Sequence, residues 1–130
     1  MKCLDTDLLI AILRGKEEAK APVADLDAES RGATTSISAF EIFFGAYKST
    51  KRKENVKEAM KLLKRLEVFS LDLSSSRRAA EISAGLIARG EAIDFRDAMI
   101  AGIAMENNLT LVTRNKTHFC RIKNLQLETW

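Results

Sequence analysis

The stretch IDFRDAMIAGIAMENNLTLVTRN, residues 93–115, decides how this chain folds. It opens with two aspartates three positions apart, Asp94 and Asp97, and continues as an apolar run with hardly a polar position as far as Met105. An apolar run of this length predicts a helix that is buried on most of its sides. The two acids therefore belong to the start of a buried helix.

A short strand is predicted to follow that helix. Asn107 and Asn108 tolerate the left-handed backbone conformation that ends many helices. Residues 109–113 are typical of a strand enclosed on both faces, and the polar residues 113–115 lie at its carboxyl end. Open parallel sheets gather reactive groups at the carboxyl ends of strands and the amino ends of helices, so this stretch offers two contributions to one site.

The remaining elements are predicted from apolar periodicity and from turn and capping residues. Strands are expected at 2–4, 33–37, 67–71 and 125–129, and helices at 8–13, 38–47, 55–66 and from the serines at 74–76 to Gly90, with a peripheral helix after Pro22 and a short connection at 119–122. This order of strands and helices indicates a three-layer α/β/α domain with a mainly parallel central sheet. With 130 residues and 46% hydrophobic content, we expect one domain over residues 1–130.

The composition limits the compartment and the partners. No apolar run reaches the length of a membrane span, and an acid at position 5 precedes any signal-peptide region, so we expect a cytoplasmic protein. A net charge of +3 permits a polyanionic partner without demanding one. Cys3 and Cys120 lack metal-binding spacing, and we expect both to be buried reduced thiols.

Acidic residues fall at several predicted junctions between elements. These residues are Asp5, Glu41, Asp94 and Asp97, with Asp7 close by. Like charges packed together repel, so such a cluster is best understood as a site for divalent cations. Oxygen ligands select hard ions, which favours magnesium or manganese over zinc.

Helix capping is the alternative explanation for some of these acids. Asp7 or Thr6 can accept the free amides of the first helix. Asp5 is not explained in this way, because a carboxylate at the end of a central strand is costly unless a cation or hydrogen bonds compensate for its burial.

The same alternative applies to the later acids. Ser38 with Glu41 three residues on has the spacing of a capping box, although Glu41 in a first turn can equally point towards Asp5. We expect Asp94 to cap the buried helix and Asp97 to be the metal ligand.

An ordered set of motifs makes the chain resemble a known family. The chain resembles the PIN-domain ribonucleases, specifically the VapC-type toxins of toxin-antitoxin pairs, through LDTD (4–7), TTSISAFE (34–41), IDFRDAMIAGIA (93–104), LTLVTRN (109–115), HF (118–119) and NLQLETW (124–130). The resemblance covers essentially the whole chain. It implies a PIN-like fold and magnesium-dependent cleavage of single-stranded RNA.

The resemblance also implies a set of metal ligands. The family's magnesium-binding positions fall on Asp5, Glu41 and Asp97, with Mn²⁺ as a substitute ion. A fourth acid common in the family is replaced here by Asn115, which leaves open whether one or two metal ions act. Asp94 is the candidate that would compensate, and we include it among the expected catalytic residues.

The expected chemistry is attack on the scissile phosphate by a metal-activated water, which, as the resemblance implies, leaves a 5′-phosphate. Supporting roles around the metal fall to Thr6, Asp7, Thr113 and Asn115, and the nearest cations for the RNA backbone are Arg96 and Arg114. The only histidine, His118, is expected to be a structural surface residue. The family also implies a small cognate antitoxin and a homodimer.

Two other functions compete with this hypothesis. The Asp5-Thr6-Asp7 sequence also resembles the nucleophile motif of haloacid-dehalogenase-type phosphatases, in which Asp5 would be phosphorylated. A non-catalytic scaffold that binds RNA or a partner is the second alternative, and Asn115 is its best support. The sequence leaves the RNA target and the antitoxin unidentified.

Overall fold

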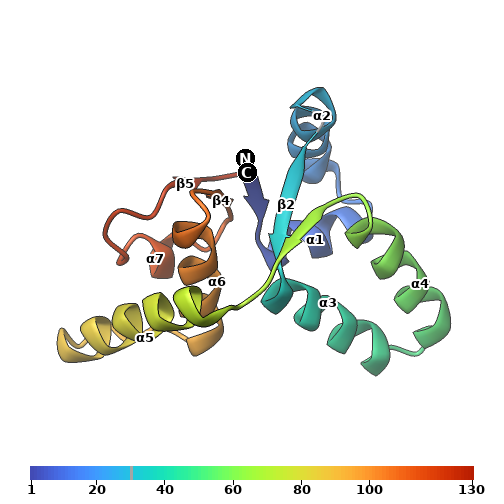
Figure 1. Ribbon diagram of the computed structural model, residues 1–130. Coiled ribbons are helices and arrows are strands. Elements are labelled where there is room, and N and C mark those ends of the chain that lie inside the picture. The colour runs from blue at the N-terminus through green and yellow to red at the C-terminus, as the bar shows by residue number, and fades with distance from the viewer. Residues whose placement is uncertain (30) are drawn as a thin grey trace.

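The computed structural model describes residues 1–29 and 31–130 (Figure 1). The elements are β1 (Lys2–Leu4), α1 (Thr6–Leu13), the short 3-10 helix η1 (Glu17–Ala19), α2 (Lys20–Glu29), β2 (Gly32–Thr35), α3 (Ser36–Lys48), α4 (Arg52–Leu63), β3 (Glu67–Phe69), α5 (Leu73–Ala88), α6 (Phe95–Glu106), β4 (Thr110–Val112), α7 (Lys116–Phe119) and β5 (Leu127–Glu128). The predicted alternation of strands and helices is confirmed.

The five strands form one sheet in the order β3-β2-β1-β4-β5, and every pairing is parallel. Cys3 in β1 is in register with Ala33 of β2 on one side and with Leu111 of β4 on the other. The chain therefore leaves β1 towards one edge and later returns to its other side. Parallel sheets form a crevice at the carboxyl ends of the strands where the order reverses in this way, which here lies between β1 and β4.

Helices cover both faces of the sheet, as the three-layer prediction requires (Figure 1). Successive strand residues point to opposite faces, so Cys3 and Leu4 belong to different cores. Cys3 and Leu111 pack with residues of α5, α6 and α7, whereas Leu4 and Val112 pack with residues of α1, α3 and α4. The central strand is therefore enclosed on both sides.

Helix α6 is buried on most sides, as its apolar sequence predicts, and it packs tightly against α5. A Cβ atom placed on Gly102 would lie 2.7 Å from the backbone oxygen of Ser75 and 3.0 Å from the backbone nitrogen of Ala79. The two helix backbones can approach this closely only because position 102 has no side chain.

Several helix starts differ from the sequence prediction because other residues cap them. Thr35 ends β2 and caps α3 by accepting the Ser38 amide, so the strand stops two residues before the predicted end at 37. Asp72, and not one of the serines at 74–76, caps α5, and Ser75 completes that capping box. Cap geometry is decided by backbone dihedral angles, which periodicity alone does not specify.

Some other helix ends agree with the sequence prediction and some differ from it. Asn108 and Gly90 adopt positive φ angles of 54° and 72° at helix ends, as predicted. Helix α4 starts at Arg52, three residues before the expected start at 55. A short helix, α7, begins before the connection expected at 119–122.

The two cysteines have different environments. Cys3 is buried, and its burial together with the charge of Asp5 raises the pKa of its thiol to about 12. Cys120 is exposed, so the prediction of a buried thiol is wrong at that position, where the chain leaves α7 at the surface. Within residues 1–29 and 31–130, no helix has the length and hydrophobicity needed to cross a membrane.

Candidate active site

Asp5 lies at the carboxyl end of the central strand β1, beside Thr113 at the end of β4. The Thr113 hydroxyl donates to Asp5 Oδ2 at 2.6 Å, and the Thr6 amide donates to Asp5 Oδ1 at 2.8 Å. Asp5 itself is the N-cap of α1, so the expectation that capping does not explain Asp5 is wrong, and the alternative of a cap at Asp7 or Thr6 is not realised. Both oxygens of a carboxylate that is only 5% exposed are therefore engaged.

The environment of Asp5 disfavours its negative charge. Burial raises the pKa of Asp5 to about 7, and the charges of Asp7 and Asp97 act in the same direction. The hydrogen bonds from Thr113 and Thr6 lower this pKa without cancelling the effect of burial. A carboxylate in this position needs a proton or a nearby cation at neutral pH.

The raised pKa predicts how stability depends on pH. Asp5 has a folded pKa of about 7 against an ordinary value of 3.8, so the folded state binds more protons and stability falls as pH rises from about 4 to about 7. Asp5→Asn should therefore raise the free energy of unfolding at pH 8 by up to about 4 kcal/mol, with little gain at pH 4. Urea unfolding in metal-free buffer at both pH values measures this.

Asp72→Asn is the control, because the Ser75 amide and hydroxyl lower the pKa of Asp72. This variant should show no gain at pH 8. An Asp5→Asn protein that is less stable than the native chain at pH 8 would contradict the prediction.

Asp94 is the N-cap of α6, as predicted, and is bound by Arg96. Asp94 Oδ1 accepts hydrogen bonds from the Arg96 amide at 2.8 Å and from Arg96 Nε at 3.1 Å. Asp94 Oδ2 accepts a hydrogen bond from Arg96 Nη2 at 3.2 Å. The Arg96 guanidinium therefore holds the pKa of Asp94 below its usual range. Asp94 is therefore an exposed helix cap whose charge is paired with the Arg96 guanidinium.

Asp97, in the first turn of α6, is more enclosed than Asp94. Its side chain is 20% exposed, and burial followed by the charge of Asp94 raises its pKa. The side-chain amide of Asn115 lies 3.5 Å from Asp97 Oδ2, and His118 Nδ1 lies 3.7 Å from the same oxygen. The charge of Asp97 contributes to the raised pKa of Asp5, and the charge of Glu41 contributes to the raised pKa of Asp97.

Glu41 reaches the cluster from α3, although not from its first turn. Helix α3 begins at Ser36 with Thr35 as its cap, so the alternative of a capping box formed by Ser38 and Glu41 is not realised. The expectation that Glu41 lies in the first turn is wrong, because Glu41 follows the cap by more than one turn. The buried Ser38 hydroxyl instead accepts from Thr6 Oγ1 at 3.0 Å. Arg96 Nη1 lies 3.5 Å from Glu41 Oε1.

The two expected RNA-binding arginines have partners within the chain. Arg96 bridges Glu41 and Asp94, with its side chain 58% exposed. Arg114 lies over the ring of Trp130, 3.7 Å from the ring centroid, and donates from Nε to the Trp130 carbonyl at 2.9 Å. Contact of either arginine with RNA stays a prediction.

Asp7 connects the start of α1 to the end of the sequence. Asp7 Oδ2 accepts the Arg114 amide at 2.9 Å and lies 3.3 Å from the Thr113 hydroxyl. Asp7 Oδ1 accepts from Trp130 Nε1 at 3.2 Å. The supporting residues Thr6, Asp7, Thr113 and Asn115 are thus all placed around the acids.

The donor set of this site fits a hard divalent cation by charge and by atom type. Asp5, Glu41 and Asp97 offer only oxygen, and burial, together with the charges of neighbouring acids, raises the pKa values of Asp5 and Asp97. Among the described residues, however, no three acidic, histidine or cysteine side chains are already close enough to hold an ion. Magnesium binding at this site is therefore a proposal.

Sequence reasoning missed two residues of this site. His118 was expected to be a structural surface residue, but it lies beside Asp97 and Asn115. Its spacing of three from Asn115, which places both on one side of a helical turn, is a signal that could have indicated this. Trp130 binds Asp7 from the other end of the chain, and no local pattern indicates a contact across such a separation.

A family comparison identifies the domain. The sequence profile of the PIN domain matches residues 2–125 of the chain. The chain belongs to the PIN-domain family. The resemblance drawn from the motifs is thereby confirmed, and the parallel sheet with helices on both faces is the PIN-like fold.

Relatives of this chain include proteins named VapC. The chain is 32% identical over 127 residues to the "tRNA(fMet)-specific endonuclease VapC" of Salmonella typhimurium, a match that covers 98% of this chain and 96% of that protein. It is 36% identical over 98 residues to "Ribonuclease VapC2" of Rickettsia felis, covering 75% of this chain and 73% of the relative. The chain is therefore a VapC-type PIN domain.

Solved structures of the family have the same fold. The DNA-bound VapBC of Salmonella typhimurium superposes with a TM-score of 0.92 at 29% identity, covering 100% of this chain and 98% of that chain. VapBC2 of Rickettsia felis, bound to a DNA fragment from its promoter, gives a TM-score of 0.91 at 29% identity, covering 99% of this chain and 98% of that chain.

Proposed function

We propose that this chain is a magnesium-dependent endoribonuclease, the toxin of a VapBC-type pair, which cleaves single-stranded RNA. Family membership and the names of the relatives support the nuclease class. The observation that carries the proposal is the buried Asp5 carboxyl at the carboxyl end of the central strand, with its pKa raised to about 7 beside two further acids. Such a group is suited to a cation.

Three carboxylates would hold the ion, namely Asp5, Glu41 and Asp97. A bound magnesium, for which manganese can substitute, would lower the pKa of a water and offset the charge that develops on the scissile phosphate. Thr113 and Thr6 fix the two Asp5 oxygens by hydrogen bonds. Asn115 and His118 flank Asp97.

The remaining polar residues have separate roles in this proposal. Arg96 and Arg114 supply positive charge for the RNA backbone, and the guanidinium of Arg96 lies beside two acids, Glu41 and Asp94. Asp7 is held by Trp130 and Arg114 and supports the Asp5 side of the site. Asp94 is occupied as a cap, which makes it a weaker candidate than Asp97 for holding the ion.

RNA cleavage in the presence and absence of metal tests the proposal. Purified protein should cleave single-stranded RNA with magnesium or manganese and should lose that activity in excess chelator. Undiminished cleavage in excess chelator would overturn the metal-dependent mechanism. RNA retention without cleavage under all metal conditions would instead favour the non-catalytic scaffold, the alternative that Asn115 supports.

The phosphatase alternative has little support from the geometry. Its nucleophile would be Asp5, but both Asp5 oxygens accept hydrogen bonds and the side chain is almost fully buried. A phosphatase mechanism would also give Glu41 no role in the cluster. A trapped aspartyl-phosphate on Asp5 during hydrolysis of a small phosphomonoester would revive it.

We also propose that the chain acts in the cytoplasm as a homodimer that binds a cognate antitoxin. Large apolar side chains exposed on α3 and α6 support a protein partner, including Phe40, Phe44, Tyr47 and Phe95. The VapBC complexes among the similar structures support an antitoxin as one such partner. Light scattering at high concentration should give twice the mass of 14.5 kDa, and a monomer would contradict the dimer.

A further inference from the structure

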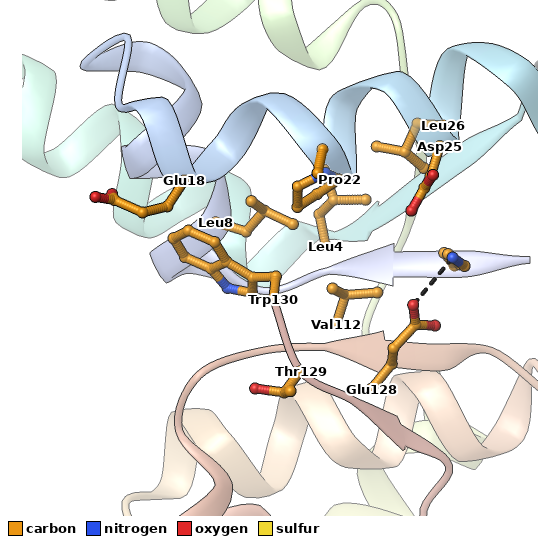
Figure 2. Close-up of a pocket in the computed structure, with 12 residues that line it drawn as sticks. Leu4, Leu8, Glu18, Pro22, Asp25, Leu26, Val112, Glu128, Thr129 and Trp130 are labelled. Carbon is orange, nitrogen blue, oxygen red and sulfur yellow. Dashed lines mark hydrogen bonds and ion pairs between the residues drawn. The ribbon is translucent and has the colours of Figure 1, made fainter.

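Trp130 is the last residue of the sequence, but its side chain lies beside the first elements of the chain (Figure 2). Figure 2 shows its ring beside Leu8 and Glu18, on the side of β1 that is covered by α1 and α2. The ring helps to line a pocket of about 190 Å³ whose floor includes Leu4 and Val112. The residue is the only tryptophan of the chain.

Polar contacts as well as packing hold Trp130 in place. Its indole N–H donates to Asp7 Oδ1 at 3.2 Å. The Arg114 guanidinium lies over the ring and donates to the Trp130 carbonyl at 2.9 Å, while the Arg114 amide donates to Asp7 Oδ2 at 2.9 Å. Asp7 is therefore held by one N–H donor on each of its oxygens.

These contacts bear directly on Asp5 because Asp5 and Asp7 share a donor. The Thr113 hydroxyl lies 2.6 Å from Asp5 Oδ2 and 3.3 Å from Asp7 Oδ2. A hydroxyl has one proton to donate, so the two carboxylates compete for it. The N–H donors from Trp130 and Arg114 satisfy the oxygens of Asp7. The Thr113 hydroxyl can therefore donate its single hydrogen bond to Asp5.

We propose that Trp130 is a positioning residue of the acidic site, which acts through Asp7 and Thr113 to fix the Asp5 carboxylate. This inference rests on the proposed function, because it assigns Trp130 a part in preparing Asp5 for a cation. Outer groups that orient a ligand in this way typically change metal affinity tenfold or more when they are removed.

The indole N–H can be separated from the packing of the ring. Trp130→Phe keeps an aromatic ring over Leu8 and under Arg114 but removes the donor to Asp7. Glu128→Gln is the matched control, since it breaks the Lys2–Glu128 ion pair of 3.0 Å near the same end of β5 without touching Asp7. Thermal unfolding confirms that each variant is folded.

Two measurements test the inference. Mn²⁺ binding, measured by electron paramagnetic resonance, should weaken about tenfold in Trp130→Phe and stay unchanged in Glu128→Gln. Amide hydrogen exchange of Arg114 and Asn115, which needs no metal, should become several-fold faster in Trp130→Phe only.

A double-mutant cycle distinguishes positioning from packing. In an Asp7→Ala background, Trp130→Phe should cause no further loss of Mn²⁺ affinity, because the route through Asp7 is already removed. An equal loss in both backgrounds, or unchanged affinity and exchange in the single variant, would overturn the inference alone. Native protein that binds no Mn²⁺ would overturn the proposed function as well, so the two failures are distinguishable.

Discussion

Asp97→Asn should reduce metal-dependent RNA cleavage by at least about 100-fold, which corresponds to roughly 3 kcal/mol in the barrier. The amide keeps the size of the side chain but removes the charge that would hold the ion. Asp97 also links Asp5 and Glu41 electrostatically, so its loss affects the whole cluster. Cleavage rates with magnesium, together with Mn²⁺ affinity, measure the effect.

Two other aspartates at helix starts provide comparisons for this variant. Asp72→Asn alters the cap of α5, where the carboxylate contacts Ser75, and should leave cleavage unchanged. Asp94→Asn tests whether Asp94 compensates for Asn115 as a fourth acid. We expect a smaller loss there than at Asp97, because Asp94 is already paired with Arg96. Full activity in Asp97→Asn would remove Asp97 from the ligand set.

Gly102→Ala should cost about 2–3 kcal/mol of unfolding free energy, a large effect for one added methyl group. The new Cβ would lie 2.7 Å from the backbone oxygen of Ser75. A backbone atom cannot relieve this clash by changing rotamer, as a long side chain could. Helices α5 and α6 would have to separate, which disturbs the packing on that face of the sheet. Urea unfolding with linear extrapolation measures the loss.

Gly85→Ala is the matched control for that variant. Gly85 lies in α5, and a Cβ there would meet nothing within 4 Å. Because alanine favours the helix over glycine, Gly85→Ala should stabilise the protein by about 0.5–1 kcal/mol. A Gly102→Ala protein as stable as the native chain would show that α5 and α6 do not need their close approach.

The places of Asp5 and Asp97 in the fold were predictable from the sequence. A short apolar segment before Asp5 indicates a buried strand, and the carboxyl end of such a strand is where parallel sheets place reactive groups. The apolar run after Asp97 likewise indicates a buried helix and places Asp97 in its first turn. These inferences depend only on local pattern and on the geometry of parallel sheets.

The capping assignments were less predictable, because several polar residues near a helix start can each serve as the cap. Asp5 caps α1, where the sequence also offered Asp7 or Thr6, and Thr35 caps α3, where it also offered Ser38. Moving one cap by a few residues moves every later residue to a different turn. Glu41 therefore lies outside the first turn and still reaches the cluster.

The sequence by itself determined the order of strands and helices, the parallel sheet and the acids at its carboxyl edge, because apolar periodicity and turn residues act over a few neighbouring positions. Only the tertiary structure decided which partner each acid has. Trp130 reaches Asp7 and Arg96 reaches Glu41 across long separations in the chain. Such pairs depend on strand register and on side-chain rotamers, which are fixed only when the two cores pack against the sheet.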